Sequence, residues 1–163
     1  MAKDIIEKSM HVYRLMIRAV FATKGEQRIA NDSVEHARVL IEELLAHAEH
    51  SVDVFCHSLS EDIWGTSSVK EMLAKVVGER PVRLRIVTQL DPAPAIGEFY
   101  RSLGASLKTL RNQNIRANFI IVDDRYFRVE PDFAVRKGFA YINKQDWADE
   151  LVADFSHIYA LAV

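Results

Sequence analysis

The stretch RANFIIVDDRYFRVEP, residues 116–131, contains the clearest structural pattern in the sequence. Four apolar residues, 119–122, run directly into Asp123, Asp124 and Arg125, and a second strand-like segment, YFRVE, follows. This pattern predicts two strands joined by a tight turn at residues 123–125. Polar residues at the end of a buried strand often belong to an active site. This stretch, however, supplies Arg116 and Asn118 and no obvious nucleophile.

The composition is that of an ordinary folded domain, with 163 residues, of which 49% are hydrophobic and 27% charged. This length supports one domain with a substantial core. A net charge of -2 excludes a general attraction to nucleic acid or anionic membranes, so any anion site must be local. The apolar runs are far shorter than the roughly 20 residues of a membrane span. With a charged N-terminus and the single Cys56, we expect a cytoplasmic protein without membrane contact.

Periodicity and capping residues outline the remaining elements. Apolar residues at helical spacing predict an amphipathic helix over 3–22, within an N-terminal segment 1–25 that either covers the core or docks a partner. Asp32 or Ser33 can cap the next helix, and Asp32 with Glu35 has capping-box spacing. The other expected elements are a strand at 52–58, a helix at 67–78 ending at Gly78, a strand at 82–89, a short helix ended by Gly104, strands at 106–110 and 138–143, and a closing helix from about Asn143.

The order of these elements predicts the fold class. Strands separated by helices tend to be parallel, and strands joined by hairpins are antiparallel. We therefore expect an α/β domain over residues 31–163, built as a mixed β-sheet flanked by helices.

From NDSVEHARVLIEELLAHAEHSVDVFC through VRLRIVT to RANFIIVDD, the sequence resembles one repeat of the phospholipase D superfamily, over about residues 31–160. The family's motif is His-x-Lys, four residues and Asp, with Gly-Ser and Asn further on. Arg116, Asn118 and Asp123 stand in place of the His, Lys and Asp, while Glu130 and Pro131 stand in place of Gly-Ser. The resemblance implies a single-repeat member with a degenerate active site. It also implies a homodimer, because single-repeat relatives pair across a two-fold axis to complete the site.

The residue types at these positions bear on activity. In the family, one histidine attacks phosphorus while another protonates the leaving oxygen. An arginine cannot be that nucleophile, because its guanidinium stays protonated and has no free lone pair. Arg116 could instead bind a phosphate through two hydrogen bonds, or form a salt bridge with Asp123 or Asp124. The candidate ligand-binding residues are Arg116, Asn118, Asp123, Asp124 and Arg125.

The sequence favours a catalytically inactive module that acts in protein assembly or binds a phosphate-bearing ligand or nucleic acid. The alternative is a phosphodiesterase or nuclease with other catalytic residues, such as His57, at the C-terminal end of a predicted strand, and Asp123. A metal site is not expected from His47, His50, Cys56 and His57, which divide between a helix end and two faces of a strand. No glycine-rich phosphate loop occurs, and we expect no cofactor. Six basic residues either form a strip for nucleic acid or a solvated face, namely Arg80, Arg83, Arg85, Lys108, Arg111 and Arg116.

Overall fold

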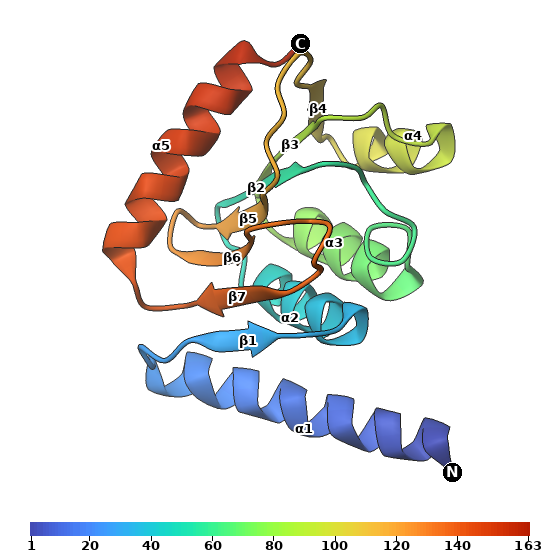
Figure 1. Ribbon diagram of the computed structural model, residues 1–163, viewed down its shortest axis with the longest axis vertical. Coiled ribbons are helices and arrows are strands. Elements are labelled where there is room, and N and C mark those ends of the chain that lie inside the picture. The colour runs from blue at the N-terminus through green and yellow to red at the C-terminus, as the bar shows by residue number, and fades with distance from the viewer.

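The computed structural model describes all 163 residues as five helices and seven strands (Figure 1). In chain order these are α1 (Ala2–Thr23), β1 (Ile29–Asn31), α2 (Val34–Ala46), β2 (Ser51–Cys56), α3 (Ser67–Glu79), β3 (Arg83–Thr88), α4 (Pro94–Ser102), β4 (Ser106–Thr109), β5 (Asn118–Val122), β6 (Tyr126–Glu130), β7 (Gly138–Tyr141) and α5 (Gln145–Leu161). All strands join one sheet in the order β1-β7-β6-β5-β2-β3-β4. The predicted α/β class with a mixed sheet is therefore confirmed.

Strand direction follows the connections. The strands β2, β3 and β4, which helices separate in the sequence, are parallel to one another. The strands β5, β6, β7 and β1 are linked antiparallel, and β5 joins the two halves by pairing antiparallel with β2. All six residues of β2 are buried, as the centre of a sheet covered on both faces requires.

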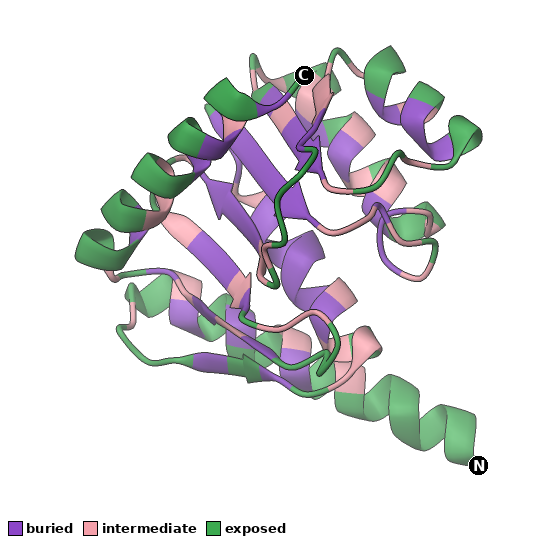
Figure 2. Cartoon of the chain, turned by 45° about the horizontal axis from the view of Figure 1, so that its top comes forward, coloured by how far each residue is buried: buried purple, intermediate pink, exposed green.

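Helices cover the two faces of the sheet unequally. Figure 1 shows α5 on one side and α2, α3 and α4 on the other, with α1 lying along the β1 edge. Alternate residues of β5 serve the two layers, since Phe119 and Ile121 pack in the cluster with α5, while Ile120 and Val122 pack in the larger cluster with α2 and α3. Figure 2 shows the resulting buried sheet beneath helices whose outer faces are exposed.

The predicted turn between β5 and β6 is confirmed. Asp123 and Asp124 both have positive φ, 55° and 54°, and the Arg125 N–H donates to the Val122 carbonyl over 3.0 Å. Two consecutive positive φ values are those of a type I′ turn, whose twist matches the flanking strands. The turn therefore fixes the register of the hairpin.

Three local expectations had different outcomes. Ser33 rather than Asp32 caps α2, accepting a hydrogen bond from the His36 N–H over 3.1 Å. Gly104, with φ of 86°, follows the end of α4 as predicted, but α3 continues past Gly78 to residue 79. The three-residue strand β1 was not predicted from the sequence, although it forms the edge of the sheet beside β7.

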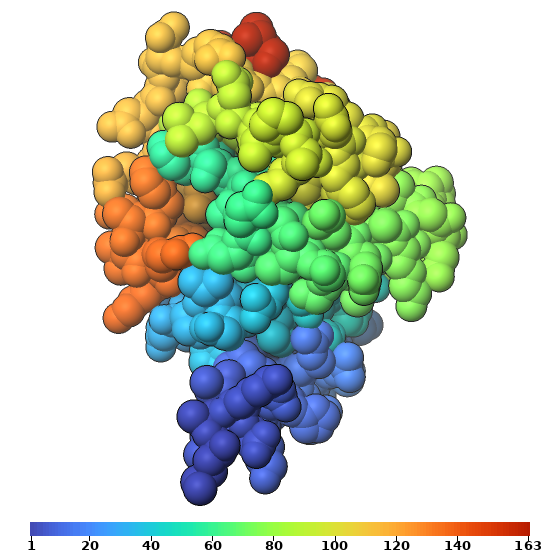
Figure 3. Space-filling view, turned by 90° about the vertical axis from the view of Figure 1, so that its right-hand side faces the viewer, coloured from blue at the N-terminus to red at the C-terminus, as the bar shows by residue number.

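The helix α1 packs on the domain with its C-terminal half. Tyr13, Ile17 and Val20 are buried, and Arg14 donates to the Glu42 and Glu43 carboxylates of α2, each over 2.7 Å. Figure 3 shows the N-terminal end of this helix projecting beyond the body of the protein. No helix combines the length and the apolarity needed to cross a membrane.

Candidate ligand-binding site

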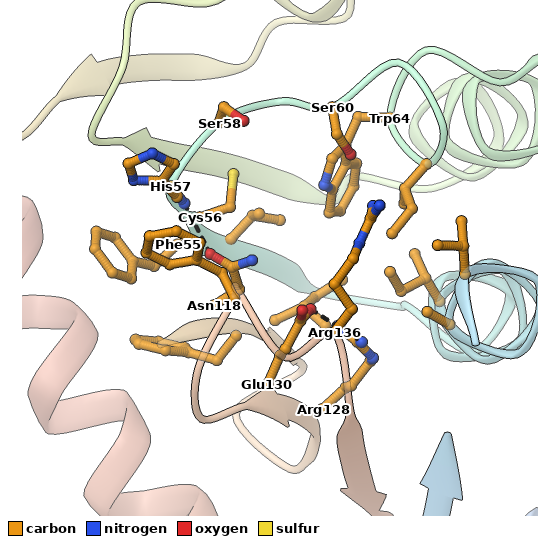
Figure 4. A pocket seen from close by; sticks show the side chains of 18 of the residues that line it. Phe55, Cys56, His57, Ser58, Ser60, Trp64, Asn118, Arg128, Glu130 and Arg136 are labelled. Carbon is orange, nitrogen blue, oxygen red and sulfur yellow. Dashed lines mark hydrogen bonds and ion pairs between the residues drawn. The ribbon is translucent and has the colours of Figure 1, made fainter. Parts of the chain in front are cut away.

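A pocket of about 330 Å³ opens where β2 ends, β5 begins and β6 ends. The antiparallel pairing of β5 with its neighbours brings these three strand termini to the same edge of the sheet. The first turn of α2, the loop after β2 and the loop after β6 complete the walls (Figure 4). A site at the C-terminal end of a parallel strand is the usual location for ligands in α/β sheets.

The inner part of the pocket is apolar. Its walls come from α2, β2, β5 and the β2–α3 loop, and comprise Val34, Ala37, Ile41, Val54, Ile63, Trp64 and Ile120. This lining is suited to a ligand with a hydrocarbon portion, because apolar walls with a few polar groups are typical of small-molecule sites.

Two charged side chains of β6, Arg128 and Glu130, are buried at the pocket wall, with exposures of 4% and 6%. They lie on the same face of the strand because they are two residues apart. The Arg128 Nε donates to the Asn31 Oδ1 over 2.8 Å, and its Nη2 donates to the Glu130 Oε2 over 3.3 Å. Burial lowers the pKa of Arg128, and the charge of Glu130 opposes this shift. None of the three residues was identified as part of a site from the sequence.

A second ion pair connects two loops at the pocket. Arg136, from the β6–β7 loop, lines the pocket and donates to the Asp62 Oδ2 of the β2–α3 loop over 2.6 Å. Burial alone would raise the pKa of Asp62, but the hydrogen bonds from Arg136 and Ser60 and the charge of Arg136 together lower it below its ordinary value. The pair therefore stays ionised and fixes the two loops against each other.

The rim between β2 and β5 carries His57 and Asn118, which both line the pocket. The backbone N–H of His57 donates to the Asn118 Oδ1 over 2.8 Å. The His57 ring stacks on Phe133 at 4.1 Å, and its Nδ1 is 3.5 Å from the Gln89 Oε1. No carboxylate hydrogen-bonds to this ring, so His57 lacks the acidic partner that orients a catalytic histidine. Burial raises the pKa of the neighbouring Cys56 thiol to about 12.

Known structures share the fold of this chain. The phospholipase D family member Nuc from Salmonella typhimurium superposes with a TM-score of 0.65 at 17% identity, over 84% of this chain and 97% of that one. NucT from Helicobacter pylori has a TM-score of 0.64 at 11% identity, over 84% and 98%. TrmBL2, an archaeal chromatin protein, has a TM-score of 0.61 at 13% identity, over 99% of this chain and 64% of that one. The chain has the phospholipase D fold.

The likeness is one of fold, since the identities are 17% or less. No family model and no curated protein matches the sequence. A shared fold supports many functions, so activity has to be argued from the side chains at the pocket.

In this phospholipase D fold, the five predicted ligand-binding residues divide between the two ends of β5. Asn118 lines the pocket, whereas Asp123, Asp124 and Arg125 follow the opposite end of the strand. Arg116 precedes β5 and does not line the pocket. These five residues therefore do not meet in one site.

Arg116 is paired, but not with the carboxylates that the sequence suggested. Its Nη2 donates to the Asp132 Oδ1 over 2.8 Å, and its guanidinium lies 5.2 Å from the Phe133 ring centre. Its expected partners, Asp123 and Asp124, are at the far end of the strand, so that part of the prediction was wrong. The hydrogen bond from Arg116 lowers the pKa of Asp132.

Asp123 supports the fold at the other end of β5. Its carboxylate accepts hydrogen bonds from the backbone N–H groups of residues 49, 50 and 51, with shortest distances of 2.9, 2.7 and 2.9 Å. Residues 49 and 50 belong to the connection between α2 and β2, and residue 51 is the first residue of β2. The carboxylate is thus occupied by backbone donors and lies away from His57, so these two residues do not form a catalytic pair.

The six basic residues expected as a possible strip all have local partners. Arg83 and Arg85 both contact the Asp53 carboxylate, at 3.4 and 2.7 Å. The other partners are backbone carbonyls 46 and 48 for Arg80, the Tyr159 ring for Lys108, Asp91 for Arg111 and Asp132 for Arg116. A nucleic-acid phosphate at this surface would have to compete with these contacts.

Proposed function

We propose that this chain is a binding module on the phospholipase D fold that lacks the histidine-dependent phosphoryl transfer of the family. The proposal rests on the contacts of the side chains at two motif positions, 116 and 118, which lie near the pocket end of β5. Asn118 accepts a hydrogen bond from the His57 backbone N–H, and Arg116 pairs with Asp132. Neither side chain supplies a nucleophile or a proton-transfer group, because a guanidinium and an amide do not titrate near neutral pH.

The pocket itself supports binding. Its volume of about 330 Å³ is at the small end of the range for ligand sites, and its lining combines apolar walls with buried polar groups. The side chains at the motif positions, Arg116 and Asn118, are instead engaged in hydrogen bonds with other residues of the protein.

A phosphodiesterase that uses His57 is the alternative to test. We expect the purified protein to hydrolyse bis-p-nitrophenyl phosphate no faster than buffer, because Arg116 and Asn118 supply no nucleophile and no carboxylate orients His57. The matched variant is His57→Ala, with Phe133→Leu as a control that removes the ring stacking but leaves the imidazole. Turnover in the wild type and in Phe133→Leu that disappears in His57→Ala would refute the proposal and establish the alternative.

For assembly, the projecting helix α1 is the second element that supports a role in binding. Ile5 and Val12 are 63% and 65% exposed, and Leu15 is 48% exposed. With Lys8, these residues follow a three–four spacing along one stripe of the helix, the pattern of a two-helix seam. We propose that α1 pairs antiparallel with α1 of a second copy, giving a homodimer whose two-fold axis lies at α1 and not at the site, where the resemblance implied it.

Opposite charges are also available along α1. In an antiparallel pair, Asp4 and Glu7 of one copy, which lie beside Lys3 and Lys8, can approach Arg18 of the other copy. Arg18 contacts Glu43 but is 57% exposed, which leaves it accessible to the other helix.

The mass in solution, measured by light scattering, tests this arrangement. We expect twice the 18.6 kDa chain mass for the wild type, one chain mass for Val12→Glu, and the wild-type result for the control Leu161→Glu, which alters an exposed apolar residue of α5. A dimer that persists in Val12→Glu would refute pairing through α1 and favour a two-fold axis at the pocket. A monomeric wild type at all concentrations would refute the homodimer.

A further inference from the structure

The cations near the pocket are already neutralised. Arg128 donates to Glu130, Arg136 donates to Asp62, and Arg116, outside the pocket, donates to Asp132. An anionic ligand would have to break one of these pairs to obtain a cation. The pocket therefore offers a phosphate group no guanidinium that is free of a carboxylate partner.

Glu130, in contrast, has unused hydrogen-bonding capacity. A carboxylate accepts about four hydrogen bonds, but Glu130 has a single side-chain partner, the Arg128 Nη2 at 3.3 Å, on its Oε2. The Arg128 Nε is directed to Asn31 and not to the other carboxylate oxygen, so the ion pair is not bidentate. Figure 4 shows the Glu130 carboxylate turned into the pocket between Asn118 and Arg136. A buried carboxylate with so few donors is stabilised by any ligand that donates N–H groups to it.

Arg128 also lines the pocket, but its Nε donates to Asn31 and its Nη2 donates to Glu130. Its partner Asn31 belongs to the edge strand β1, is fully buried, and does not line the pocket. The Arg128 guanidinium is therefore already engaged by two side chains when a ligand reaches Glu130.

The apolar walls complete the description of the ligand. They surround the space next to Glu130 with residues of α2, β2 and the β2–α3 loop, including Ile41, Val54 and Trp64. Each methylene group buried there is worth about fourfold in affinity. A short hydrocarbon chain attached to the donor group therefore adds substantially to binding.

From these contacts we propose that the pocket binds small primary amines with an aliphatic body, the ammonium group at Glu130 and the chain against the apolar walls. This inference rests on the proposed binding function and specifies its ligand class. An ammonium group has the opposite charge to phosphate. The proposal therefore predicts that amines bind more tightly than alcohols and alcohols more tightly than anions, whereas an anion site would give the reverse order.

Four probes with the same five-carbon chain test the head group, namely pentylammonium, pentanol, pentanoate and pentyl phosphate. Binding is measured by calorimetry and by amide chemical-shift changes at residues that line the pocket. We expect pentylammonium to bind at least tenfold more tightly than pentanol, since charge-assisted hydrogen bonds are roughly twice as strong as neutral ones. The two anions should bind more weakly than pentanol, because they face Glu130.

Two variants and a control locate the site. Glu130→Gln keeps an acceptor for Arg128 but removes the charge, and should abolish the tenfold preference for pentylammonium over pentanol. Ala134→Phe fills the pocket from an exposed rim position and should weaken all four probes together. Glu98→Gln, an exposed acid of α4, should leave every affinity unchanged.

Tightest binding by pentyl phosphate, equal binding of pentylammonium and pentanol, or no saturable binding by any probe would each overturn the inference. If Glu130→Gln does not fold, the order of the four probes on the wild type and their loss in Ala134→Phe still decide it. His57-dependent phosphodiester turnover would refute the proposed function separately, without changing the order of these affinities.

Discussion

Replacing Asp123 with alanine should destabilise the protein much more than the same change at its neighbour Asp124. Both residues have almost the same left-handed backbone conformation, with φ of 55° and 54°, so the conformational cost of alanine is matched. They differ in side-chain contacts, because only Asp123 receives hydrogen bonds, from the backbone N–H groups of residues 49–51. The pair of variants therefore isolates the contribution of the carboxylate.

The expected magnitude follows from these three donors. A hydrogen bond to a charged group contributes about 1.5–3 kcal/mol. Residues 49 and 50 are exposed and can recover water, whereas Ser51 is 6% exposed and its N–H would lose its only side-chain acceptor. We expect Asp123→Ala to lose about 3–4 kcal/mol, including about 1 kcal/mol for alanine at positive φ, and Asp124→Ala to lose only that last contribution.

Urea unfolding followed by far-ultraviolet circular dichroism measures both losses, provided the dependence on urea concentration is unchanged. Asp123→Asn should fall between the two, because the Oδ1 atom, which accepts from all three backbone amides, is retained. Equal losses of stability in Asp123→Ala and Asp124→Ala would refute a structural role for the Asp123 carboxylate.

Three further outcomes are expected. The Cys56 thiol, whose pKa burial raises to about 12, should resist alkylation at pH 8 in the folded protein and react after unfolding; rapid reaction of the native protein would contradict its burial. Asp132→Ala should release Arg116 and create weak, salt-sensitive pyrophosphate binding that Arg116→Ala lacks, and calorimetry that finds no difference between these variants would make Arg116 irrelevant to anions. Asp62→Asn should lower the melting temperature at pH 7. Because the folded pKa of Asp62 lies below its ordinary value of 3.8, the difference from wild type should persist from pH 7 to about pH 4 and shrink below it; a difference that vanishes near pH 6 would exclude the pair with Arg136.

The sequence predicts the centre of the fold well because its signals there are local. The apolar run 119–122 followed by two aspartates specifies a buried strand and a type I′ turn within a few residues. Ser33 and Gly104 mark helix ends through their own side-chain or backbone chemistry. In each case the residues that carry the signal are also the residues that form the structure.

The pocket was not predictable in the same way, because its polar contacts join distant segments. Arg128 and Asn31 are 97 residues apart in the sequence, and Asn31 belongs to a strand of only three residues that exists through pairing with β7. Arg136 and Asp62 are 74 residues apart. Charged residues at alternate positions of β6 were visible in the sequence as Arg128 and Glu130, but in a strand this pattern is also typical of a solvated face.

The position of Asp123 shows how the requirements of this fold can be met apart from those of a catalytic site. Among the positions that resemble the family's motif, Asp123 is the one that matches, and its carboxylate binds the backbone at the end of β5 that is remote from the pocket. Arg116 and Asn118, which do not match, lie at the other end of the strand, where Arg116 donates to Asp132 and Asn118 accepts from the His57 backbone N–H. The length of β5 therefore separates the residue that supports the fold from the two residues nearest the pocket. A matching aspartate at this position is therefore evidence for the fold, and evidence about activity has to come from the two residues at the opposite end of the strand.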